Sequence, residues 1–289
     1  MNGIILVDKP EGFTSFDVVA KLRGILRERR IGHSGTLDPM ATGLLVVFVG
    51  RATRAVEFAE SHEKEYIAAL RPGIITDTQD ITGAVLNTTD KVLSRDALLS
   101  FLPEFTGELQ QTPPMYSAIK VGGKKLYELA RKGVEIERES RVVTIKVLEL
   151  VDEENGDFIL RVVCSKGTYI RSLVSDIGER LGTGATLSSL RRTAAGNYSV
   201  NDAHTLDEIS ELAQNGGLET ILKPVDSLFE EFPSYSISEQ QRKRALNGNS
   251  FEASLLDGKY RVYDENGSFL MLGNVENGIM STVKSFFEI

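Results

Sequence analysis

Apolar and polar positions alternate along the chain in short blocks, a pattern typical of a globular protein that mixes strands and helices. Apolar runs predict strands over residues 3–7, 44–49, 66–70, 141–151, 158–164 and 188–195. Apolar residues spaced by three or four predict helices over residues 16–26, 95–102, 126–132, 168–181 and 206–213. Thr14 or Ser15 is the expected cap of the first helix, and Phe16 is expected on its apolar face. Because the order lacks a regular βαβ alternation, the pattern favours an α+β fold.

The pattern of apolar runs and turn residues changes near Phe232 and Pro233. Beyond this point Gly and Asn turns separate short strand-like runs over residues 261–263, 269–272 and 283–287. We therefore expect two domains, a main one over residues 1–232 and a small β domain over residues 233–289. Within the main domain, residues 112–141 contain two prolines, a Gly-Gly-Lys-Lys turn and a short basic helix, and they predict a basic insertion outside the core.

The composition fits a cytoplasmic protein without a prosthetic group. Hydrophobic residues make up 41% of the 289 positions and charged residues 26%, and no apolar run approaches the roughly 20 residues of a membrane span. The N-terminus has neither the basic region nor the cleavage site of a secretory signal. The single cysteine, Cys164, excludes an internal disulfide, and one cysteine with three histidines offers no recognisable metal cluster. We expect no metal and no other cofactor.

The net charge of -8 argues against nucleic acid as a partner, but its distribution argues the other way. Residues 21–30, 120–146 and 161–192 each carry a net charge of +4, so the acidic excess lies in the rest of the chain. Segregated charge allows an acidic protein to present a basic surface to phosphates.

One segment combines an acid with a rigid backbone. Residues 35–43, GTLDPMATG, hold Asp38 among Gly, Thr and Pro, whose restricted backbones would present the carboxylate in a fixed direction. His33 lies five residues upstream, and Arg51 and Arg54 follow. An acid among bases suits an anionic substrate with an electrophilic carbon, although Asp before Pro is also a common turn former.

Three further segments bring reactive side chains to unusual positions. Lys9 lies in a turn rich in Pro and Gly, and Tyr66 opens a strand. In residues 164–171, CSKGTYIR, Lys166 precedes a helix start, where backbone N–H groups attract phosphate or carboxylate. Each residue alone would pass for an ordinary cap, surface turn or core aromatic. Four such segments in one chain indicate a shared site.

These segments resemble the bacterial TruB family of tRNA pseudouridine synthases. The matching blocks are DKPEG (8–12), GHSGTLDPMATG (32–43), KEY (64–66), TDTQD (76–80), PPMYSA (113–118), SKGTYIR (165–171) and LRR (190–192). They run in order from Gly3 to about Tyr198, and GTLDPMATG is the most specific of them. The resemblance implies an α+β pseudouridine synthase catalytic domain with a mixed or antiparallel sheet. The C-terminal part matches more loosely and resembles a small PUA-type RNA-binding β domain.

The resemblance implies an isomerase that converts uridine 55 of the TΨC loop of tRNA into pseudouridine. The base is flipped out, its glycosidic bond is broken, and the base turns and is reattached through carbon, without a cofactor. Asp38 would be the catalytic aspartate, and attack on the sugar and removal of its C2′ proton both stay open as its first step. Tyr66 would stack on the base and help in the late proton transfer, and Arg171 would pair with Asp38.

The resemblance also implies a set of substrate contacts. Lys9 would support the loop near the site, Tyr169 and Leu190 would line the pocket, and His33 would fill the gap left by the flipped base. Extruding a nucleotide costs a few kcal/mol, and stacking on an aromatic ring returns roughly 1–3 kcal/mol. Further RNA contacts are expected from Lys120, Lys124, Lys125, Arg131, Lys166, Arg191 and Arg192.

The expected partner is the T arm and elbow of tRNA, with neither membrane nor guide RNA, and we expect a monomer. One alternative is a tRNA-binding RNA chaperone whose synthase activity is incidental. Another is a hydrolytic nucleosidase or glycosidase, although such enzymes commonly use paired carboxylates and this pattern supplies one acid. A third is a relative that works with guide RNA, but the compact chain without long basic tails favours the stand-alone bacterial form.

Overall fold

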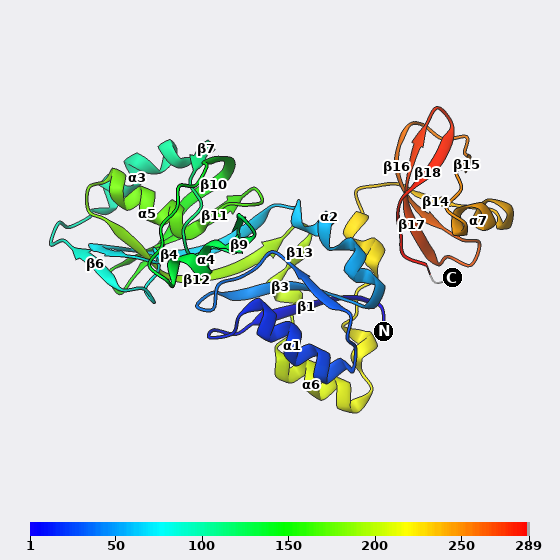
Figure 1. Ribbon diagram of the computed structural model, residues 1–289, viewed down its shortest axis with the longest axis horizontal. Coiled ribbons are helices and arrows are strands. Elements are labelled where there is room, and N and C mark those ends of the chain that lie inside the picture. Colours follow the sequence, from blue (N-terminus) through cyan, green and yellow to red (C-terminus); the bar gives the residue numbers. More distant parts are fainter. Residues whose placement is uncertain (288–289) are drawn as a thin grey trace.

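The structure is a computed structural model that describes residues 1–287, with the side chain of Lys125 excepted. A large sheet with helices packed against it forms the main body, and a smaller β unit lies at the C-terminal end (Figure 1). This arrangement confirms the predicted α+β class. None of the helices within residues 1–287 is long and apolar enough to cross a membrane.

The main sheet has nine strands. They are β1 (Gly3–Lys9), β2 (Ile31–Ser34), β3 (Thr42–Val49), β4 (Lys64–Pro72), β7 (Gly107–Gln111), β10 (Arg141–Glu154), β11 (Asp157–Cys164), β12 (Ala185–Ala195) and β13 (Tyr198–Ser199). The order is β1-β3-β12-β4-β11-β10-β7, with β2 paired to β3 and β13 paired to β12. The pairing of β12 with β3 is parallel, and the other pairings in this sheet are antiparallel.

Six helices and two small hairpins surround this sheet. The helices are α1 (Ser15–Leu26), α2 (Val56–Glu60), α3 (Arg95–Phe101), α4 (Leu126–Ala130), α5 (Ile170–Arg180) and α6 (Leu206–Asn215). The hairpins are β5 (Ile74–Thr76) with β6 (Val85–Thr88), and β8 (Lys120–Val121) with β9 (Lys124–Lys125). The second hairpin and α4 belong to the predicted basic insertion.

The sequences of β1 and β3 are almost continuously apolar because other parts of the protein pack on both faces of these strands. Alternate residues of a strand point to opposite faces. Ile5 and Val47 pack with α1 and α6, whereas Leu6 and Val46 pack on the other face with Ala52 and its neighbours before α2. These strands therefore form the rigid base from which the segment between β2 and β3 projects.

Helix α1 begins after Thr14, whose side chain accepts a hydrogen bond from the N–H of Asp17 in a capping box. Its buried side consists of Ser15, Val18, Val19, Leu22 and Leu26. Phe16 is 63% exposed, so its predicted place on the apolar face is wrong. The ring lies roughly 100° around the helix from the centre of the buried stripe.

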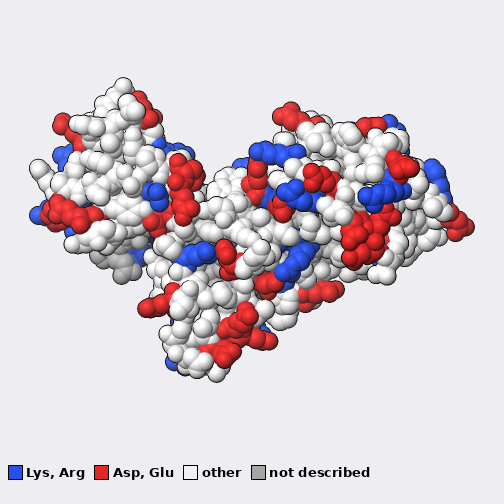
Figure 2. All heavy atoms as spheres, turned by 180° about the vertical axis from the view of Figure 1, so that it is seen from behind, with Lys and Arg blue, Asp and Glu red and all other residues white. Residues whose placement is uncertain are grey.

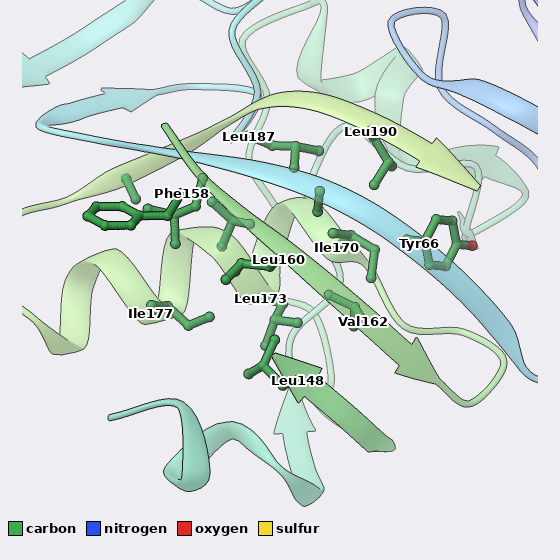
Figure 3. Packing of buried hydrophobic residues seen from close by; sticks show 14 of the residues in the cluster. Tyr66, Leu148, Phe158, Leu160, Val162, Ile170, Leu173, Ile177, Leu187 and Leu190 are labelled. Carbon is green, nitrogen blue, oxygen red and sulfur yellow. The ribbon is translucent and has the colours of Figure 1, made fainter. Parts of the chain in front are cut away.

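A second core lies where α5 packs across β4, β11 and β12 (Figure 3). Leu173 and Ile177 of the helix contact side chains from these three strands, including Leu160 and Leu187. Tyr66 lies at one end of this cluster, and its hydroxyl points away from the other labelled side chains (Figure 3). The packing fixes both the start of α5 and the aromatic ring at the same end of the core.

The C-terminal unit is a second sheet with one helix. It contains β14 (Ser234–Ser236), α7 (Glu239–Leu246), β15 (Phe251–Glu252), β16 (Gly258–Tyr263), β17 (Phe269–Glu276) and β18 (Ile279–Ser285), in the strand order β14-β16-β17-β18-β15. Strands β16, β17 and β18 overlap the three strand-like runs predicted over residues 261–263, 269–272 and 283–287. The sequence pattern missed α7 because this helix is almost wholly polar and buries only Ala245.

An aromatic cluster joins the C-terminal unit to the main body. Phe229 packs edge-on against Phe58 at 5.3 Å between ring centroids, and it also contacts Phe269 and Phe286. Next to these rings, Arg54 donates hydrogen bonds to Ser285, and Lys284 pairs with Glu57 at 2.6 Å. Polar contacts therefore surround an apolar junction.

The basic side chains that follow the GTLDPMATG segment serve this junction. Arg51 donates a hydrogen bond to the carbonyl of Phe287, and Arg54 bonds Ser285. The expectation that Arg51 and Arg54 lie close to Asp38 is therefore wrong. Asp38 precedes β3, whereas both arginines follow the opposite end of this eight-residue strand.

Replacement of Phe229 by alanine tests the junction. Phe229 is 2% exposed and contacts three other rings, so Phe229→Ala is expected to lower the free energy of unfolding by about 3–5 kcal/mol. Chemical denaturation followed by fluorescence measures the change. Leu256→Ala, at a leucine that is 85% exposed, serves as the control and is expected to change stability by less than about 0.5 kcal/mol. Equal effects would contradict a stabilising junction.

Candidate active site

Asp38 lies at the start of a tight turn between β2 and β3. The N–H of Ala41 donates to the carbonyl of Asp38 at 3.1 Å, and Pro39 occupies the second position of the turn, where its fixed φ is favoured. The Asp38 side chain is 37% exposed. The rigid turn expected from the sequence is therefore present, and it leaves the carboxylate partly open to solvent.

Four hydrogen bonds, with Ser15, Gly12 and Lys9, hold this turn against the end of β1 and the start of α1. The Ser15 hydroxyl accepts from the N–H of Leu37 at 2.9 Å and donates to the Leu37 carbonyl at 3.2 Å. The Pro39 carbonyl accepts from the N–H of Gly12 at 2.8 Å and from Lys9 Nζ at 3.3 Å. The residues on both sides of Asp38 are thus fixed, so its carboxylate is held at a defined position.

Lys9 is the last residue of β1 and is fully buried, not part of a surface turn. Its ammonium group also donates to the carbonyls of Pro10 and Phe13. Burial lowers the pKa of Lys9 to about 8, although the charge of Asp38 opposes this shift. Lys9 therefore organises the loops on either side of it through three carbonyl oxygens.

Gly43 is needed where the segment enters β3. Its φ is +96°, and a Cβ atom there would lie 2.3 Å from the carbonyl oxygen of Arg192. The residue therefore permits the close parallel approach of β3 to β12. A side chain at this position would force apart the two strands that carry the Asp38 turn and Arg192.

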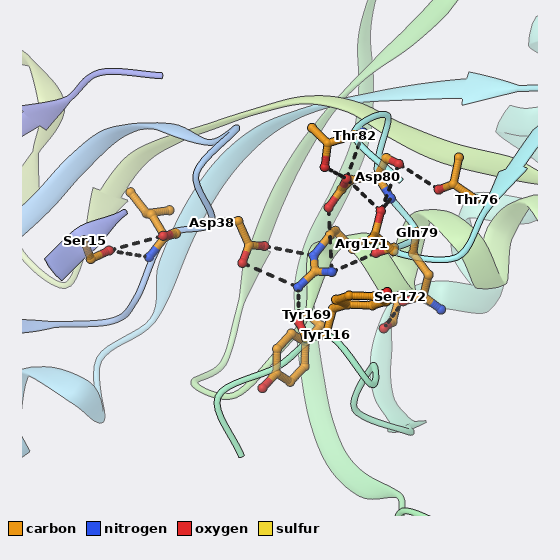
Figure 4. A network of polar contacts seen from close by, with 12 residues as sticks. Ser15, Asp38, Thr76, Gln79, Asp80, Thr82, Tyr116, Tyr169, Arg171 and Ser172 are labelled. Carbon is orange, nitrogen blue, oxygen red and sulfur yellow. Dashed lines mark hydrogen bonds and ion pairs between the residues drawn. The ribbon is translucent and has the colours of Figure 1, made fainter. Parts of the chain in front are cut away.

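Arg171, in the first turn of α5, binds the Asp38 carboxylate with two nitrogens. Nε lies 2.9 Å from Oδ2 and Nη2 lies 3.5 Å from Oδ1, while the Arg171 side chain is 4% exposed. The same guanidinium donates to the carbonyl of Thr78 and to that of Tyr116, both at 2.7 Å. The chain thus surrounds one buried guanidinium with acceptors from three other segments (Figure 4).

Asp80 forms a second, buried layer of this network (Figure 4). One of its oxygens lies 3.7 Å from Arg171 Nη1, and the other accepts hydrogen bonds from Thr78 and Thr82. Thr76 donates to the Asp80 carbonyl at 2.7 Å. The turn between β5 and β6 is thereby shaped into a support for Arg171.

The start of α5 is fixed from a third side by Gln111 at the end of β7. Its side-chain amide accepts from the N–H of Tyr169 at 2.7 Å and donates to the Tyr169 carbonyl at 3.0 Å. The Tyr169 ring lies under the guanidinium of Arg141, at 5.0 Å from the ring centroid. Gln111 thus fixes the backbone of Tyr169, two residues before Arg171.

Tyr66 lies on β4 directly opposite Arg192 of β12. Burial raises the pKa of the Tyr66 phenol, and the neighbouring charge of Arg192 opposes that shift. The phenol is therefore neutral at neutral pH. Leu190, two residues before Arg192 on the same strand, is buried in the core around α5.

Arg192 is not at the surface. It is 1% exposed, and its Nε donates to the carbonyl of Leu44 at 2.6 Å. A surface contact between Arg192 and a phosphate, expected from the sequence, is therefore wrong, because β12 directs this side chain into the protein. Arg191 points to the other face and pairs with Asp8 at 2.7 Å, with 43% of its side chain exposed.

The other basic residues expected to contact RNA occupy different settings. Lys120, Lys124, Arg131 and Lys166 are exposed, and the Lys125 side chain lies outside the described part of the structure. His33, on β2, is partly buried, and burial together with the charge of Arg192 lowers the pKa of its imidazole. On the face seen in Figure 2, basic and acidic side chains are interspersed, and a recess separates the C-terminal unit from the main body.

Sequence reasoning missed several residues that build the site. Ser15 and Gln111 form hydrogen bonds with the backbone of Leu37, next to Asp38, and of Tyr169, and Asp80 forms an ion pair with Arg171. A signal existed for Asp80, because TDTQD was one of the recognised blocks. Ser15 and Gln111 carry no such signal, since their importance follows from contacts with residues 22 and 58 positions away.

Two family models match the chain. Residues 23–170 match the N-terminal domain of TruB family pseudouridylate synthase, and residues 171–230 match the C-terminal domain of tRNA pseudouridylate synthase B. The tRNA pseudouridine synthase B of Clostridium kluyveri is 42% identical over 99% of this chain and 100% of its own length. That of Bacillus cytotoxicus is 45% identical over 86% of this chain and 83% of its own length.

Solved structures show the same fold. A Cbf5–Nop10–Gar1 complex contains a chain that matches with a TM-score of 0.75 and 26% identity, over 99% of this chain and 85% of that one. An H/ACA RNP bound to a substrate RNA containing 2′-deoxyuridine matches with the same TM-score, 24% identity and the same coverage. Both comparisons extend over the C-terminal unit, beyond the residues that the two family models match.

Replacement of Ser15 tests the support of the Asp38 turn. In Ser15→Ala the buried N–H and carbonyl of Leu37 lose their partner, so we expect the free energy of unfolding to fall by about 1–3 kcal/mol. Ser100→Ala, at an exposed serine on α3, is the matched control and is expected to change it by less than about 0.5 kcal/mol. Urea denaturation of the two variants measures the difference, and a Ser15 variant as stable as the control would refute the clamp.

Proposed function

Because this chain belongs to the TruB family of pseudouridylate synthases, we propose that it isomerises uridine 55 in the TΨC loop of tRNA to pseudouridine. The observation that carries the proposal is the Asp38 carboxylate, held in a rigid turn and paired with the buried Arg171. The names of the relatives supply the substrate class, since they are tRNA pseudouridine synthases.

Asp38 is the proposed catalytic residue. Arg171 aligns both carboxylate oxygens, and the backbone on each side of Asp38 is fixed by Ser15 and Lys9. A carboxylate held in this way can attack C1′ of the ribose or remove the C2′ proton, and either route benefits from the fixed orientation. In both routes the C1′–N1 bond breaks, the uracil turns, C5 bonds to C1′, the C5 proton is lost and N1 gains a proton; in the second route a proton also returns to C2′.

The flipped base is proposed to bind between Asp38 and Tyr66. The Tyr66 ring lies at the end of the apolar core, with its hydroxyl directed away from the other labelled side chains (Figure 3), which suits stacking on a base and a part in the late proton transfer. Tyr169 and Leu190 would line the same pocket. His33 would fill the gap in the RNA, and the lowered pKa of its imidazole favours the neutral ring for stacking.

RNA contacts are proposed on both parts of the chain. Residues 1–232 would form the catalytic domain, and residues 233–289 a PUA-like RNA-binding domain. The basic residues of the insertion, Lys120, Lys124, Lys125 and Arg131, would contact phosphates together with Lys166 and Arg191. The side chains of Lys120, Lys124, Arg131 and Lys166 are exposed, and that of Lys125 lies outside the described part of the structure. We propose that the protein acts as a monomer in the cytoplasm without guide RNA.

Asp38→Asn separates synthesis from RNA binding. The amide is nearly the same size as the carboxylate but cannot act as nucleophile or base. We expect pseudouridine formation in an unmodified tRNA transcript to fall by on the order of 10⁴-fold or more, while binding of that transcript persists. Mapping of pseudouridine and a filter-binding assay measure the two properties, and Asp90→Asn, at an exposed aspartate, is the control.

The outcome of this experiment decides between the proposals for the chain. Undiminished pseudouridine in Asp38→Asn would refute the assigned residue. A wild-type protein that binds and refolds tRNA without forming pseudouridine would favour an RNA chaperone. Release of free uracil would favour a hydrolase.

Arg131→Ala tests the proposed phosphate contacts. Loss of one phosphate contact is expected to weaken tRNA binding and to reduce the slope of log K against log salt by about one or less. Arg95→Ala is the matched control, because Arg95, on α3, is also exposed but forms an ion pair with Glu153 of β10. Titrations at several salt concentrations give the slopes, and an unchanged slope for Arg131→Ala would remove Arg131 from the RNA-binding surface.

A further inference from the structure

Three basic side chains are buried together behind the Asp38 turn. Lys9 is 0% exposed, Lys64 is 7% exposed and Arg192 is 1% exposed. Each bonds backbone carbonyls: Lys9 bonds three, Lys64 bonds those of two residues just before it, and Arg192 bonds Leu44. We call Lys9, Lys64 and Arg192 the buried cations.

The buried cations differ from two other basic residues of the sheet, Arg71 and Arg161, each of which forms an ion pair with a carboxylate. Within residues 1–287, no carboxylate lies within ion-pair distance of any of the buried cations. Moreover, both Nη1 and Nη2 of Arg192 are buried and lack a hydrogen bond of good geometry among the described residues, although this side chain interacts with the Tyr66 phenol and opposes the rise of its pKa. Unpaired buried charge is costly, so its presence calls for a physical reason.

The charges act on one another and on the site. Burial lowers the pKa of Lys64 to about 8, and the neighbouring Arg192 contributes to the lowering. The same two causes act on Lys9, where the negative charge of Asp38 opposes them. The group thus maintains a positive potential in a region that excludes water, where such a potential is strongest.

The position of Arg192 directs this potential towards the base pocket. Arg192 lies opposite Tyr66 on adjacent strands, and a Cβ atom on Gly35 would lie 3.0 Å from its Nη1. Gly35 precedes Asp38 by three residues. The free end of the guanidinium therefore lies between the aromatic ring and the turn that bears the carboxylate, the two groups between which the uracil is proposed to bind.

We propose that the buried cations, and Arg192 above all, stabilise the negative charge that develops on uracil as it detaches from the ribose. This inference rests on the function proposed above. When the C1′–N1 bond breaks, its electron pair leaves on N1, and the base carries a negative charge until C5 bonds to C1′. Fixed positive charges near the departing group lower the energy of that transition state. The buried cations do not touch the base in this proposal. They act on it at a distance, through their electrostatic potential and past the Tyr66 ring, and we therefore class them as positioning residues and not as catalytic ones.

A substrate with a more stable departing base tests this role. Fluorine at C5 withdraws electrons, so 5-fluorouracil is a better leaving anion than uracil and needs less help from the protein. The experiment uses hairpin RNAs of the T arm with either uridine or 5-fluorouridine at the target position. Enzyme is in excess over RNA, so that the first turnover is observed, and nuclease digestion with mass spectrometry follows loss of the original nucleoside.

We expect Arg192→Met to slow the uridine reaction by on the order of 10²–10³-fold, the usual effect of removing a group that stabilises developing charge. The 5-fluorouridine reaction should be slowed at least about tenfold less. Arg192→Lys, which retains a charge but loses the fork of donors, should lie between wild type and Arg192→Met, and Lys64→Met should show the same substrate dependence. Arg180→Met, at an exposed arginine at the far end of α5, removes a charge elsewhere and should leave both rates unchanged.

Equal slowing of the two substrates, or no slowing, would overturn the inference and leave Arg192 a purely structural residue. Thermal unfolding of each variant identifies any that fails to fold. If Arg192→Met is one of these, Arg192→Lys and Lys64→Met provide the same comparison. A wild-type enzyme that does not form pseudouridine would instead refute the proposed function, so the two failures are distinguishable.

Discussion

The site depends on the need to satisfy one buried guanidinium. Arg171 has its donors directed at Asp38, at the carbonyls of Thr78 and Tyr116, and towards Asp80. These acceptors come from the turn before β3, from the turn between β5 and β6, and from the start of the insertion. Because a guanidinium is planar and its donors have fixed directions, the segments must meet in one arrangement, and that arrangement aims the Asp38 carboxylate.

This constraint is effective because both sides of the pair are fixed separately. On one side the turn that carries Asp38 is held by Ser15, and by Lys9, on the base formed by β1 and β3. On the other side α5 packs along β4, β11 and β12, and Gln111 holds the backbone just before Arg171. Neither partner can turn away without disrupting a packed core, so the carboxylate is oriented before any substrate arrives.

The sequence predicted the parts of this design that are local. Apolar runs located β1 and β3, and Gly and Pro around Asp38 predicted its turn, because these signals depend on neighbouring residues. The long-range parts were missed or misjudged. Arg192 was expected at the surface, since a strand pattern does not say which of two adjacent arginines faces inward once both faces of the sheet are covered. Gln111 gave no signal because its role arises from a contact with Tyr169, 58 residues further along the chain.

The two buried arginines show why burial alone does not define a role. Arg171 has two carboxylates and two backbone carbonyls around it, so its charge is balanced by the groups that it holds in place. Arg192 bonds one carbonyl through Nε and has no carboxylate within ion-pair distance among the described residues, and Lys9 and Lys64 add charge of the same sign nearby. A purely structural cation would gain stability from a carboxylate partner. A carboxylate beside Arg192 would, however, cancel the positive potential next to Tyr66, and the absence of one among the described residues agrees with the proposal that this site receives a uracil anion.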